Sequence, residues 1–275
     1  NTNNKVRGRK DIENLSLPFV GEIPLKTDAG KNKSTHTNKS IVIKQGSRDI
    51  INEAFRVLRT NLEFMLDAKI ENKASVTLFT SFNPGSGKTF LTMNTAATFA
   101  MKGKRILVID GDLRHGSASA YLGSQHKGLS DYLGKRESCL DALVQENPDI
   151  PGFFLLPAGT IPPNPTELLA EPLFKETIEQ LRGHYDYILI DCPPIDIVAD
   201  TQIIEKLADR TVFVVRAGLL ERDMLSELQR MYDEKRFKNM ALLLNGTEGG
   251  GNRYGYRYGY KYGYKYGYGS KNYYK

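Results

Sequence analysis

A glycine-rich stretch, SFNPGSGKTF at residues 81–90, contains the residue types that bind phosphate groups. Glycines let successive backbone N–H groups face an anion, a lysine supplies positive charge, and a hydroxyl suits Mg²⁺. A strand-like run precedes this stretch and a helix-like segment follows it, as phosphate loops require. The strict pattern has glycine at position 82, where this chain has Phe82. The residues predicted to bind nucleotide are Pro84, Gly85, Ser86, Gly87, Lys88, Thr89 and Phe90.

Three aspartates end two further apolar runs, ILVIDGDLR and YILIDCPP. Isolated aspartates at strand ends are commonly helix caps or turn formers. Asp110, Asp112 and Asp191, however, all emerge at the edge where the phosphate loop would hold its ligand. Because Mg²⁺ takes carboxylate, hydroxyl and phosphate oxygens, they offer a metal site and a proton acceptor. The predicted metal ligands are Thr89, Asp112 and Asp191, and the spacing leaves open which of Asp110 and Asp112 is the base and which binds the metal.

The elements that must position these residues alternate along the chain. Apolar, strand-like runs occur at 75–81, 105–110, 152–158, 187–191, 211–215 and 240–245, separated by segments with helical spacing. Continuous apolar strands alternating with helices predict a mostly parallel central sheet with helices on both faces, the α/β class of P-loop NTPases. The ligand site is expected at the carboxyl edge of those strands. Before them, apolar residues at steps of three and four predict one amphipathic helix over 48–66.

Charge divides the chain into three parts. Residues 1–48 carry +6, residues 49–248 carry −6 and residues 249–275 carry +6. Basic ends around an acidic core suit a membrane surface or an acidic partner and argue against a DNA-binding core. No run of about 18 apolar residues occurs. We therefore predict a juxtamembrane-type linker over 1–47, a catalytic domain over 48–247 and a tail over 248–275, with Cys139 and Cys192 as reduced thiols.

The chain ends in RYGYRYGYKYGYKYGYGSKNYYK, residues 253–275, which holds ten tyrosines but no Leu, Ile, Val or Phe. Without an apolar pattern to bury, this tyrosine-rich tail is expected to be flexible. One interpretation is a sticky tail that stacks on single-stranded nucleic acid. The other is a set of exposed phosphate acceptors: Tyr254, Tyr256, Tyr258, Tyr260, Tyr262, Tyr264, Tyr266, Tyr268, Tyr273 and Tyr274.

In combination, these motifs resemble those of the bacterial tyrosine autokinases, a P-loop family that controls capsule and exopolysaccharide export. The three nucleotide motifs of that family match SFNPGSGKT, ILVIDGDLR and ILIDCPP, and a missing first glycine is usual for it. Further matches are EAFRVLR, GTIPPNPTELL and the tyrosine-rich tail, so the resemblance covers about residues 48–275. In the third motif Cys192 stands where the family more often has Thr or Ser, which puts a hydroxyl role there in doubt.

The resemblance implies a kinase that uses ATP and Mg²⁺ to phosphorylate its own tail tyrosines in trans. The implied catalytic residues are Lys88, Asp110, Asp112 and Arg114. The implied partners are an upstream membrane co-polymerase segment, a cognate phosphotyrosine phosphatase and further copies of the chain in a ring, an octamer, with no nucleic acid. The implied location is the cytoplasmic face of the bacterial inner membrane.

Glu53, Arg56 and Arg59 have the ExxRxxR spacing of this family and share one face of the predicted helix. From spacing alone they form a solvated charged stripe. The resemblance implies instead that they contact the next subunit. In PPNPTELL, Asn164 is the predicted N-cap of a short helix, with Pro165 in its first turn.

Two other functions fit parts of the sequence. Positioning ATPases related to MinD share the expected fold and the three motifs, but they carry a second lysine in the phosphate loop, five residues before the invariant one. This chain has Asn83 there, and those ATPases lack a tyrosine tail. A nucleic-acid-binding protein would leave the acidic core and the phosphate site without a use. The kinase interpretation accounts for all three parts of the chain.

Overall fold

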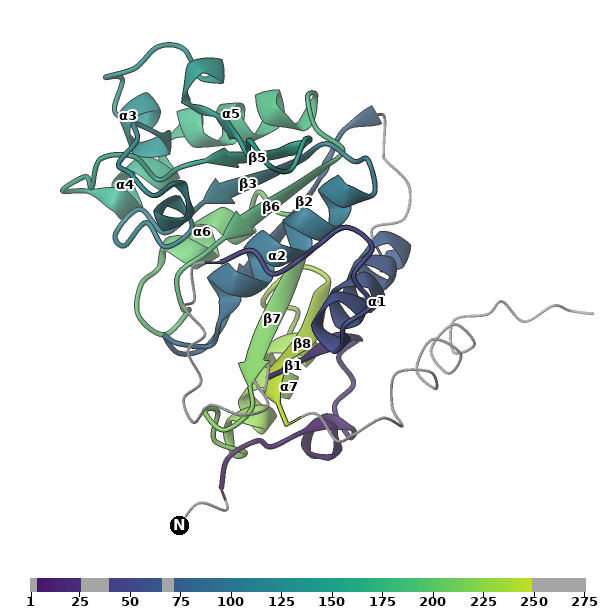
Figure 1. Ribbon diagram of the computed structural model, residues 1–275. Helices are drawn as coiled ribbons and strands as arrows, with labels where there is room; N and C mark the ends of the chain where they lie inside the picture. Colours follow the sequence, from purple (N-terminus) through teal and green to yellow (C-terminus); the bar gives the residue numbers. More distant parts are fainter. Residues whose placement is uncertain (1–3, 26–39, 66–71, 249–275) are drawn as a thin grey trace, which may run out of the picture.

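The computed structural model describes residues 4–25, 40–65 and 72–248, which form one eight-stranded sheet covered by helices (Figure 1). The strand order is β1-β8-β7-β2-β6-β3-β5-β4, and every neighbouring pair is parallel except β4 and β5. The strands are β1 Phe19–Pro24, β2 Ser75–Thr80, β3 Ile106–Asp110, β4 Gln145–Glu146, β5 Phe153–Leu156, β6 Tyr187–Asp191, β7 Arg210–Arg216 and β8 Met240–Thr247. The predicted α/β fold with a mostly parallel sheet is confirmed, as are its six predicted strands.

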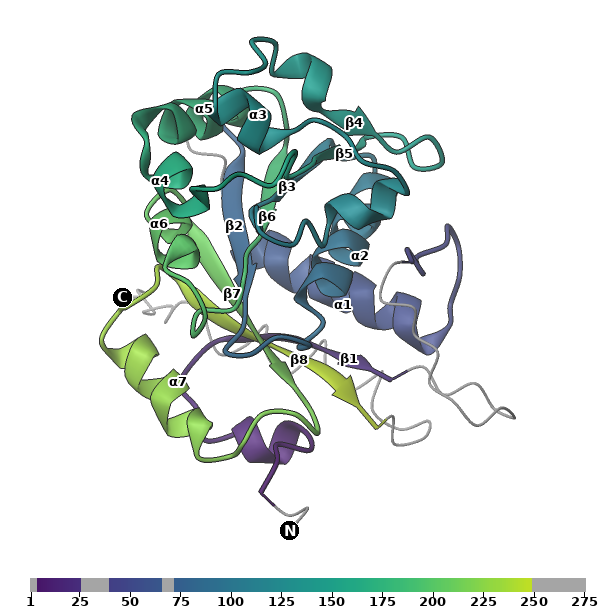
Figure 2. The ribbon, with the colours of Figure 1, turned by 90° about the vertical axis from the view of Figure 1, so that its left-hand side faces the viewer.

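Helices cover both faces of the sheet (Figures 1 and 2). The α-helices are α1 Ile50–Met65, α2 Lys88–Met101, α3 Leu129–Leu133, α4 Pro165–Ala170, α5 Pro172–Arg182, α6 Asp200–Glu205 and α7 Met224–Asp233. Successive side chains of a strand point to opposite faces, and the buried residues sort accordingly. In β7, for example, Val212 and Val214 pack in the core under α1 and α2, whereas Phe213 and Val215 pack with α7. A third cluster fills the space between the sheet and α3 to α6.

The N-terminal segment is a correction to the sequence analysis, which read residues 1–47 mostly as linker. Its described part contains a 3-10 helix, Arg9–Ile12, and β1, which pairs with β8 at the sheet edge. Val6 and Val20 are fully buried, so this segment belongs to the core. Two prolines and a glycine interrupt the strand pattern around β1, which explains why periodicity alone did not identify it.

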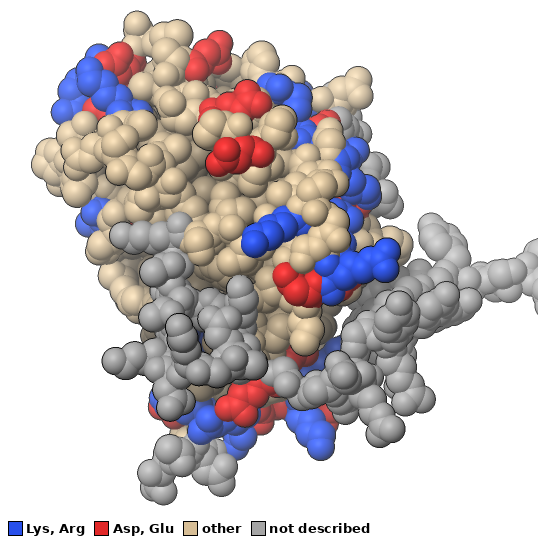
Figure 3. All heavy atoms as spheres, viewed as in Figure 1, with Lys and Arg blue, Asp and Glu red and all other residues tan. Residues whose placement is uncertain are grey.

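Helix α1 confirms the amphipathic helix expected over 48–66. Phe55, Leu58 and Leu62 are completely buried against the sheet and α2, while Ile50 and Phe64 are each 69% exposed. On the face shown in Figure 3, Lys and Arg side chains are interspersed with Asp and Glu side chains. Within residues 4–25, 40–65 and 72–248, no helix is long and apolar enough to cross a membrane.

Candidate active site

The strand order brings the three predicted motifs to one edge of the sheet. β6 lies between β2 and β3, so the loops that follow these strands are neighbours. The register pairs Asp191 with Phe79 on one side and with Asp110 on the other. The chain turns from one side of β2 to the other between β6 and β7, and such switch points open a crevice at the carboxyl ends of parallel strands. The predicted motifs therefore lie together at the expected edge of the sheet, and their role as a ligand site stays a prediction.

The phosphate loop, residues 82–88, runs from β2 into the N-terminus of α2. Gly85 and Gly87 have φ of 80° and 84°, a left-handed conformation that favours glycine. Gly87 is the N-cap residue of α2, and the first N–H groups of a helix have no partner within it. Together with the helix dipole, these donors make the loop an anion site. Phe82, at the position of the absent glycine, is 2% exposed and packs edge-on against Phe213 with ring centroids 4.7 Å apart.

Two residues from β7, the neighbour of β2, and from β8, the next strand, hold the phosphate loop by its carbonyl groups. Arg216, at the end of β7, donates from Nη1 to the carbonyl oxygen of Gly85 at 2.6 Å. Asn245 of β8 donates from Nδ2 to the carbonyl oxygen of Ser86 at 3.0 Å. A methyl group on Gly87 would stand 2.3 Å from that Nδ2 atom, so glycine is also required there for space. Both braces leave the N–H groups of the loop for a ligand.

Asp191 lies directly beside the start of α2. The Thr89 hydroxyl donates to its Oδ2 at 2.6 Å, whereas its Oδ1 is buried and has no hydrogen-bond partner among the described residues. Burial raises the pKa of Asp191 to about 6, although Lys88 and the Thr89 hydroxyl favour its charged form. A buried carboxylate oxygen without a partner is costly unless a cation or donor satisfies it.

These oxygens fit Mg²⁺ bound together with a nucleotide. Within the described part of the chain, no three His, Cys, Asp or Glu side chains converge closely enough to hold a metal by themselves. Mg²⁺ usually takes only one or two carboxylates and completes its shell with water and phosphate oxygens. The hydroxyl of Thr89 and the free oxygen of Asp191 are donors of the right kind beside the phosphate loop.

Asp110 and Asp112 form the acidic loop, residues 110–116, after β3. Asp110 is completely buried and accepts hydrogen bonds from the Ser119 N–H at 2.8 Å and the Ser119 hydroxyl at 2.6 Å. Burial first, and the negative charge of Asp191 second, raise the pKa of Asp110 to about 7. Asp112 is 5% exposed, and its Oδ1 accepts N–H groups of Arg114 at 3.3 Å and His115 at 3.2 Å. Two buried carboxylates therefore lie close enough to Asp191 for their charges to interact with it.

The predicted catalytic Arg114 is engaged by two side chains of the neighbouring helices. Its Nε donates to Oδ2 of Asp200 at 3.2 Å, and its Nη2 donates to the hydroxyl of Thr166 at 2.9 Å. That hydroxyl donates in turn to Oδ1 of Asp200 at 2.6 Å. Asp200 is completely buried at the start of α6, and Thr166 belongs to the GTIPPNPTELL motif. In this arrangement the hydrogen bonds to Asp200 and Thr166 fix the guanidinium of Arg114 beside the acidic loop.

The predicted subunit-contact residues have different surroundings on α1. Glu53 and Arg56 pair with each other, and both remain accessible. Arg59 is turned toward α2, where its Nη1 donates to the carbonyl oxygen of Thr98 at 3.2 Å. The ring of Phe90 packs edge-on against Phe55 of α1, so α1 also supports the start of α2.

Sequence reasoning missed several residues of the site. Arg216, Asn245, Ser119 and Asp200 carry no local motif and reach the site only through the fold. Half-buried Tyr121 was also missed; burial, and then the charge of Asp191, raise its pKa above the ordinary value. The capping prediction is confirmed in part. Asn164 is the N-cap of α4 with proline in its first turn, but its side chain makes no capping hydrogen bond to the helix backbone.

Both cysteines are free thiols in the structure, Cys139 exposed and Cys192 buried. Burial raises the pKa of Cys192 well above its usual value, and its Sγ faces the carbonyl oxygen of Ile190 at 3.8 Å. This neutral thiol occupies the position where the family more often has a hydroxyl. The tail tyrosines, residues 254–274, lie outside the described residues.

Comparison with known proteins decides among the P-loop families. Residues 75–236 match the AAA domain family. A tyrosine-protein kinase of Bacillus subtilis, YwqD, is 32% identical over 219 residues, which cover 79% of this chain and 90% of that protein. The chain belongs to the bacterial tyrosine-protein kinases. A putative member from Erwinia amylovora, AmsA, is 38% identical over 241 residues, but this chain covers only 32% of its length.

Solved structures of tyrosine kinase domains have the same fold. The kinase domain of the Escherichia coli tyrosine kinase ETK superposes with a TM-score of 0.76 at 28% identity, over 91% of this chain and all of that chain. The BceF kinase domain gives a TM-score of 0.73 at 32% identity, over 88% of this chain and 99% of that chain. MinD of Pyrococcus horikoshii, solved with Mg-ADP, gives 0.50 at 23% identity, a likeness of fold.

Proposed function

We propose that this tyrosine kinase uses Mg-ATP to phosphorylate the tyrosines of its own C-terminal tail, on another copy of the chain. The observation that carries the proposal is the unpartnered buried Oδ1 of Asp191, which lies beside Thr89 at the mouth of a phosphate loop. A cation bound to phosphates satisfies that oxygen. The tail then supplies the acceptor hydroxyls that a kinase of this family needs.

Each side chain has a role that follows from its position. Residues 85–90 bind the phosphates through backbone N–H groups, Pro84, which has no N–H, precedes them, and Lys88 supplies positive charge to the β- and γ-phosphates. Thr89 and Asp191 would hold Mg²⁺, with Asp112 as a further ligand where Asp110 is the base, and the metal would neutralise charge on the transferred group. The tyrosine oxygen forms a bond to the γ-phosphorus while the bond to the ADP oxygen breaks. The tyrosine proton passes to a carboxylate.

Asp110 and Asp112 are the two candidates for that proton acceptor. A tyrosine hydroxyl has a pKa near 10, so it needs a base at the moment of transfer. Asp110, with its pKa raised to about 7, has the basicity of an effective proton acceptor near neutral pH. Asp112 is 5% exposed and lies in the same loop as Arg114, whose role is to stabilise charge on the transferred phosphate.

The surrounding biology follows from the same family relationship. The chain spans most of the Bacillus subtilis relative but about a third of the Erwinia amylovora one, so the kinase unit occurs in chains of both lengths. We infer a ring of copies that contact each other through Glu53, Arg56 and Arg59, at the cytoplasmic face of the inner membrane. Phosphorylation there regulates polysaccharide export together with a membrane co-polymerase segment and a phosphotyrosine phosphatase.

A mixing experiment tests transfer between copies. One chain carries Lys88→Met and keeps its tail tyrosines, and the other is active but has all ten tail tyrosines replaced by phenylalanine. Neither labels itself if the proposal is correct. Incubation of the mixture with Mg-ATP is expected to label the Lys88→Met chain, as resolved by intact mass. No label in the mixture, together with normal labelling of the unmodified protein, would show that transfer occurs within one chain.

A further inference from the structure

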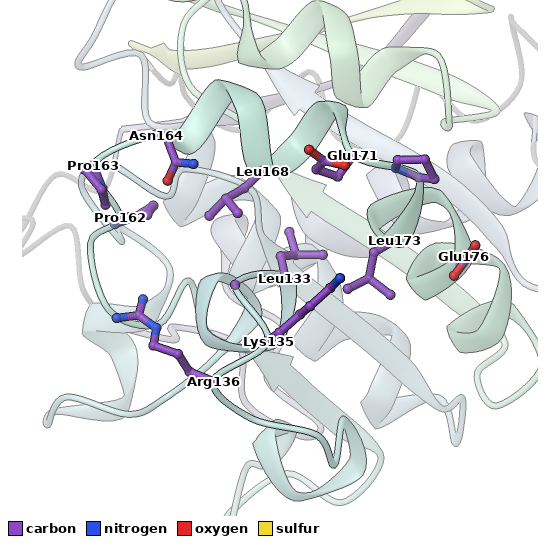
Figure 4. Close-up of a pocket in the computed structure, with 12 residues that line it drawn as sticks. Leu133, Lys135, Arg136, Pro162, Pro163, Asn164, Leu168, Glu171, Leu173 and Glu176 are labelled. Atoms are coloured by element: carbon purple, nitrogen blue, oxygen red, sulfur yellow. The ribbon is translucent and has the colours of Figure 1, made fainter.

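A groove in the surface lies between α3, α4 and α5 (Figure 4). Its volume is about 700 Å³, within the range of pockets that bind small ligands or single side chains. The apolar part of its lining consists of Leu133, Leu168, Leu173, Pro162 and Pro163. We call it the α3–α5 groove. Its apolar part suits an aromatic ring.

Charges of both signs line the same groove. Lys135 and Arg136 project from the end of α3, and Glu171 and Glu176 project from the start of α5 (Figure 4). All four are exposed. Among the described residues, Lys135, Glu171 and Glu176 have no ion pair and no side-chain hydrogen bond, and the guanidinium of Arg136 has a single carboxylate at 3.7 Å. The groove thus presents separated charges that a ligand can satisfy.

The backbone at Lys135 adopts a conformation that usually belongs to glycine. Its φ is +61°, just after the end of α3, where a glycine commonly ends a helix. This conformation is less favourable for a residue with a side chain than for glycine. Hydrogen bonds from the N–H groups of Lys135 and Arg136 to the last turn of α3, at 3.0 and 2.9 Å, hold the two residues in place. The backbone of these two residues is thereby held at the groove, and their cationic side chains diverge from it (Figure 4).

The groove is joined to the acidic loop through α4. Asn164 and Leu168 line the groove, and Thr166 between them hydrogen bonds to Arg114 at 2.9 Å. The opposite wall is tied to the same segment, because Asp131 of α3 accepts the N–H of Thr160 at 3.1 Å. A ligand in the groove therefore contacts one face of α4, the helix whose Thr166 holds Arg114 at the rim of the active site.

The tail has the composition that this groove accommodates once it is phosphorylated. Each tyrosine from 254 to 266 has Arg or Lys on one side and Gly on the other, and residues 253–275 contain no acidic residue. A phosphotyrosine adds about −1.5 to −2 charges at neutral pH. Each phosphotyrosine in that range thus carries an anionic phosphate at the end of an aromatic ring, and its neighbour in the sequence is a cationic Arg or Lys. The groove offers Lys135 and Arg136 for the anion, Glu171 and Glu176 for the cation, and leucines for the ring.

We propose that the α3–α5 groove binds a phosphotyrosine of the tail of a second copy and so retains a partly phosphorylated tail beside the active site. The inference rests on the proposed kinase function. Retention lets the remaining tyrosines of the same tail reach the acidic loop before the tail leaves. The groove makes tail phosphorylation processive.

Direct binding of a synthetic peptide tests the groove without any need for catalysis. The protein is the full chain with Lys88→Met and with serine at its ten tail tyrosines, so that its own tail neither reacts nor competes. The probes are two fluorescent peptides of sequence 253–275, one with phosphate on Tyr262 and one without. By fluorescence anisotropy, the phosphopeptide is expected to bind at least tenfold more tightly. Equal affinity for the two peptides would overturn the proposal.

Matched variants locate the binding. Lys135→Gly removes the cationic side chain and relieves the left-handed backbone, so the fold is not compromised. It is expected to raise the Kd of the phosphopeptide about tenfold. The control, Lys175→Ala, removes an exposed lysine of α5 that does not line the groove, and is expected to change the Kd less than twofold. The same response to both variants would mean that the phosphopeptide binds elsewhere.

Two further experiments test the role of Glu171 and Glu176 and the processivity of tail phosphorylation. Glu171→Gln with Glu176→Gln is expected to weaken binding of the phosphopeptide several-fold, and tighter binding would contradict the assigned orientation. In the otherwise unmodified chain, Lys135→Gly is expected to shift intact masses toward singly phosphorylated tails at equal ATP consumption. An unchanged distribution would overturn processivity, whereas no phosphate on the unmodified chain would overturn the proposed kinase function instead.

Discussion

The phosphate loop and the acidic loop lie at the same sheet edge, but their hydrogen bonds have opposite polarity. In the phosphate loop, Arg216 and Asn245 bond to carbonyl oxygens, so the N–H groups remain for a ligand. In the acidic loop, carboxylates accept N–H groups of their own loop, from Asp112 to Asp110 and from Arg114 to Asp112. One loop is thus built to receive an anion and the other to present negative charge to a cation or proton.

The two loops are also held differently. The phosphate loop is braced by side chains of the neighbouring strands β7 and β8, whereas the acidic loop is closed on itself and is tied outward through Arg114. Damage to the first loop is therefore expected to remove phosphate binding outright. Damage to the outer ties of the second is expected to reduce the rate and leave binding largely intact.

The largest effect is expected for Lys88→Met. This change removes the positive charge on the β- and γ-phosphates, and we expect ATP hydrolysis and tail phosphorylation to fall together by about 10³-fold. The side chain lies at the mouth of the loop, so the thermal unfolding midpoint should stay within a few degrees of that of the parent. Lys102→Met, at the other end of α2, is the matched control and should retain activity. Undiminished tail labelling in Lys88→Met would disprove the role of the phosphate loop.

Asp110→Asn separates activity from stability. We expect about a 10²- to 10⁴-fold loss of transfer if Asp110 is the proton acceptor. Because the folded protein keeps Asp110 protonated up to about pH 7 while the unfolded chain ionises near its usual pKa, the folded state binds more protons in between. The corresponding stability is complete below the unfolded pKa and is lost as pH rises to about 7. Without nucleotide, the free energy of unfolding of the variant at pH 8 should therefore be about 1–3 kcal/mol higher than that of the parent.

Denaturant titrations between pH 5 and pH 8 measure this difference. The free energy of unfolding of the parent should decrease as pH rises, and the decrease should be smaller in Asp110→Asn. Asp191, whose pKa is raised to about 6, accounts for part of the remaining slope. Parallel curves for the two proteins would show that burial does not raise the pKa of Asp110.

Gly87→Ala tests the brace on the phosphate loop. The added methyl group meets Nδ2 of Asn245 at 2.3 Å and demands φ of +84°, so we expect ATP affinity to fall about 30- to 100-fold. Asn245→Ala in the same chain removes the clash but not the backbone strain, and should restore part of the affinity. Isothermal titration with an ATP analogue completes the double-mutant cycle. Additive losses in the double variant would mean that Asn245 and Gly87 do not interact.

A smaller effect is expected at the outer tie of the acidic loop. Asp200→Asn removes the charge that holds Arg114, and we expect kcat to fall about tenfold with little change in the KM for ATP. Thr166→Ser keeps the hydroxyl and should behave like the parent, while Thr166→Val should resemble Asp200→Asn. An increase in the KM for ATP with an unchanged kcat would place this network at the nucleotide instead.

The sequence predicts the active site wherever a motif is local. Asp110 and Asp191 end β3 and β6, Asp112 comes just after β3, and Lys88 ends the loop that follows β2, so the parallel topology places them together. Arg216 and Asn245 could not be predicted, because they contact the phosphate loop across 131 and 159 residues of sequence and nothing beside them has a distinctive pattern. The same limit applies to β1, which pairs only with β8 at the other end of the chain.

The most direct measurement of the central claim is intact mass of the full chain after incubation with Mg-ATP, followed by mapping of the phosphates. We predict several phosphate increments on the parent, all within residues 254–274, and none on Lys88→Met. Phosphate on the parent outside the tail, or ATP hydrolysis without any tail phosphate, would contradict the account that the phosphate loop and the acidic loop together serve the C-terminal tyrosines.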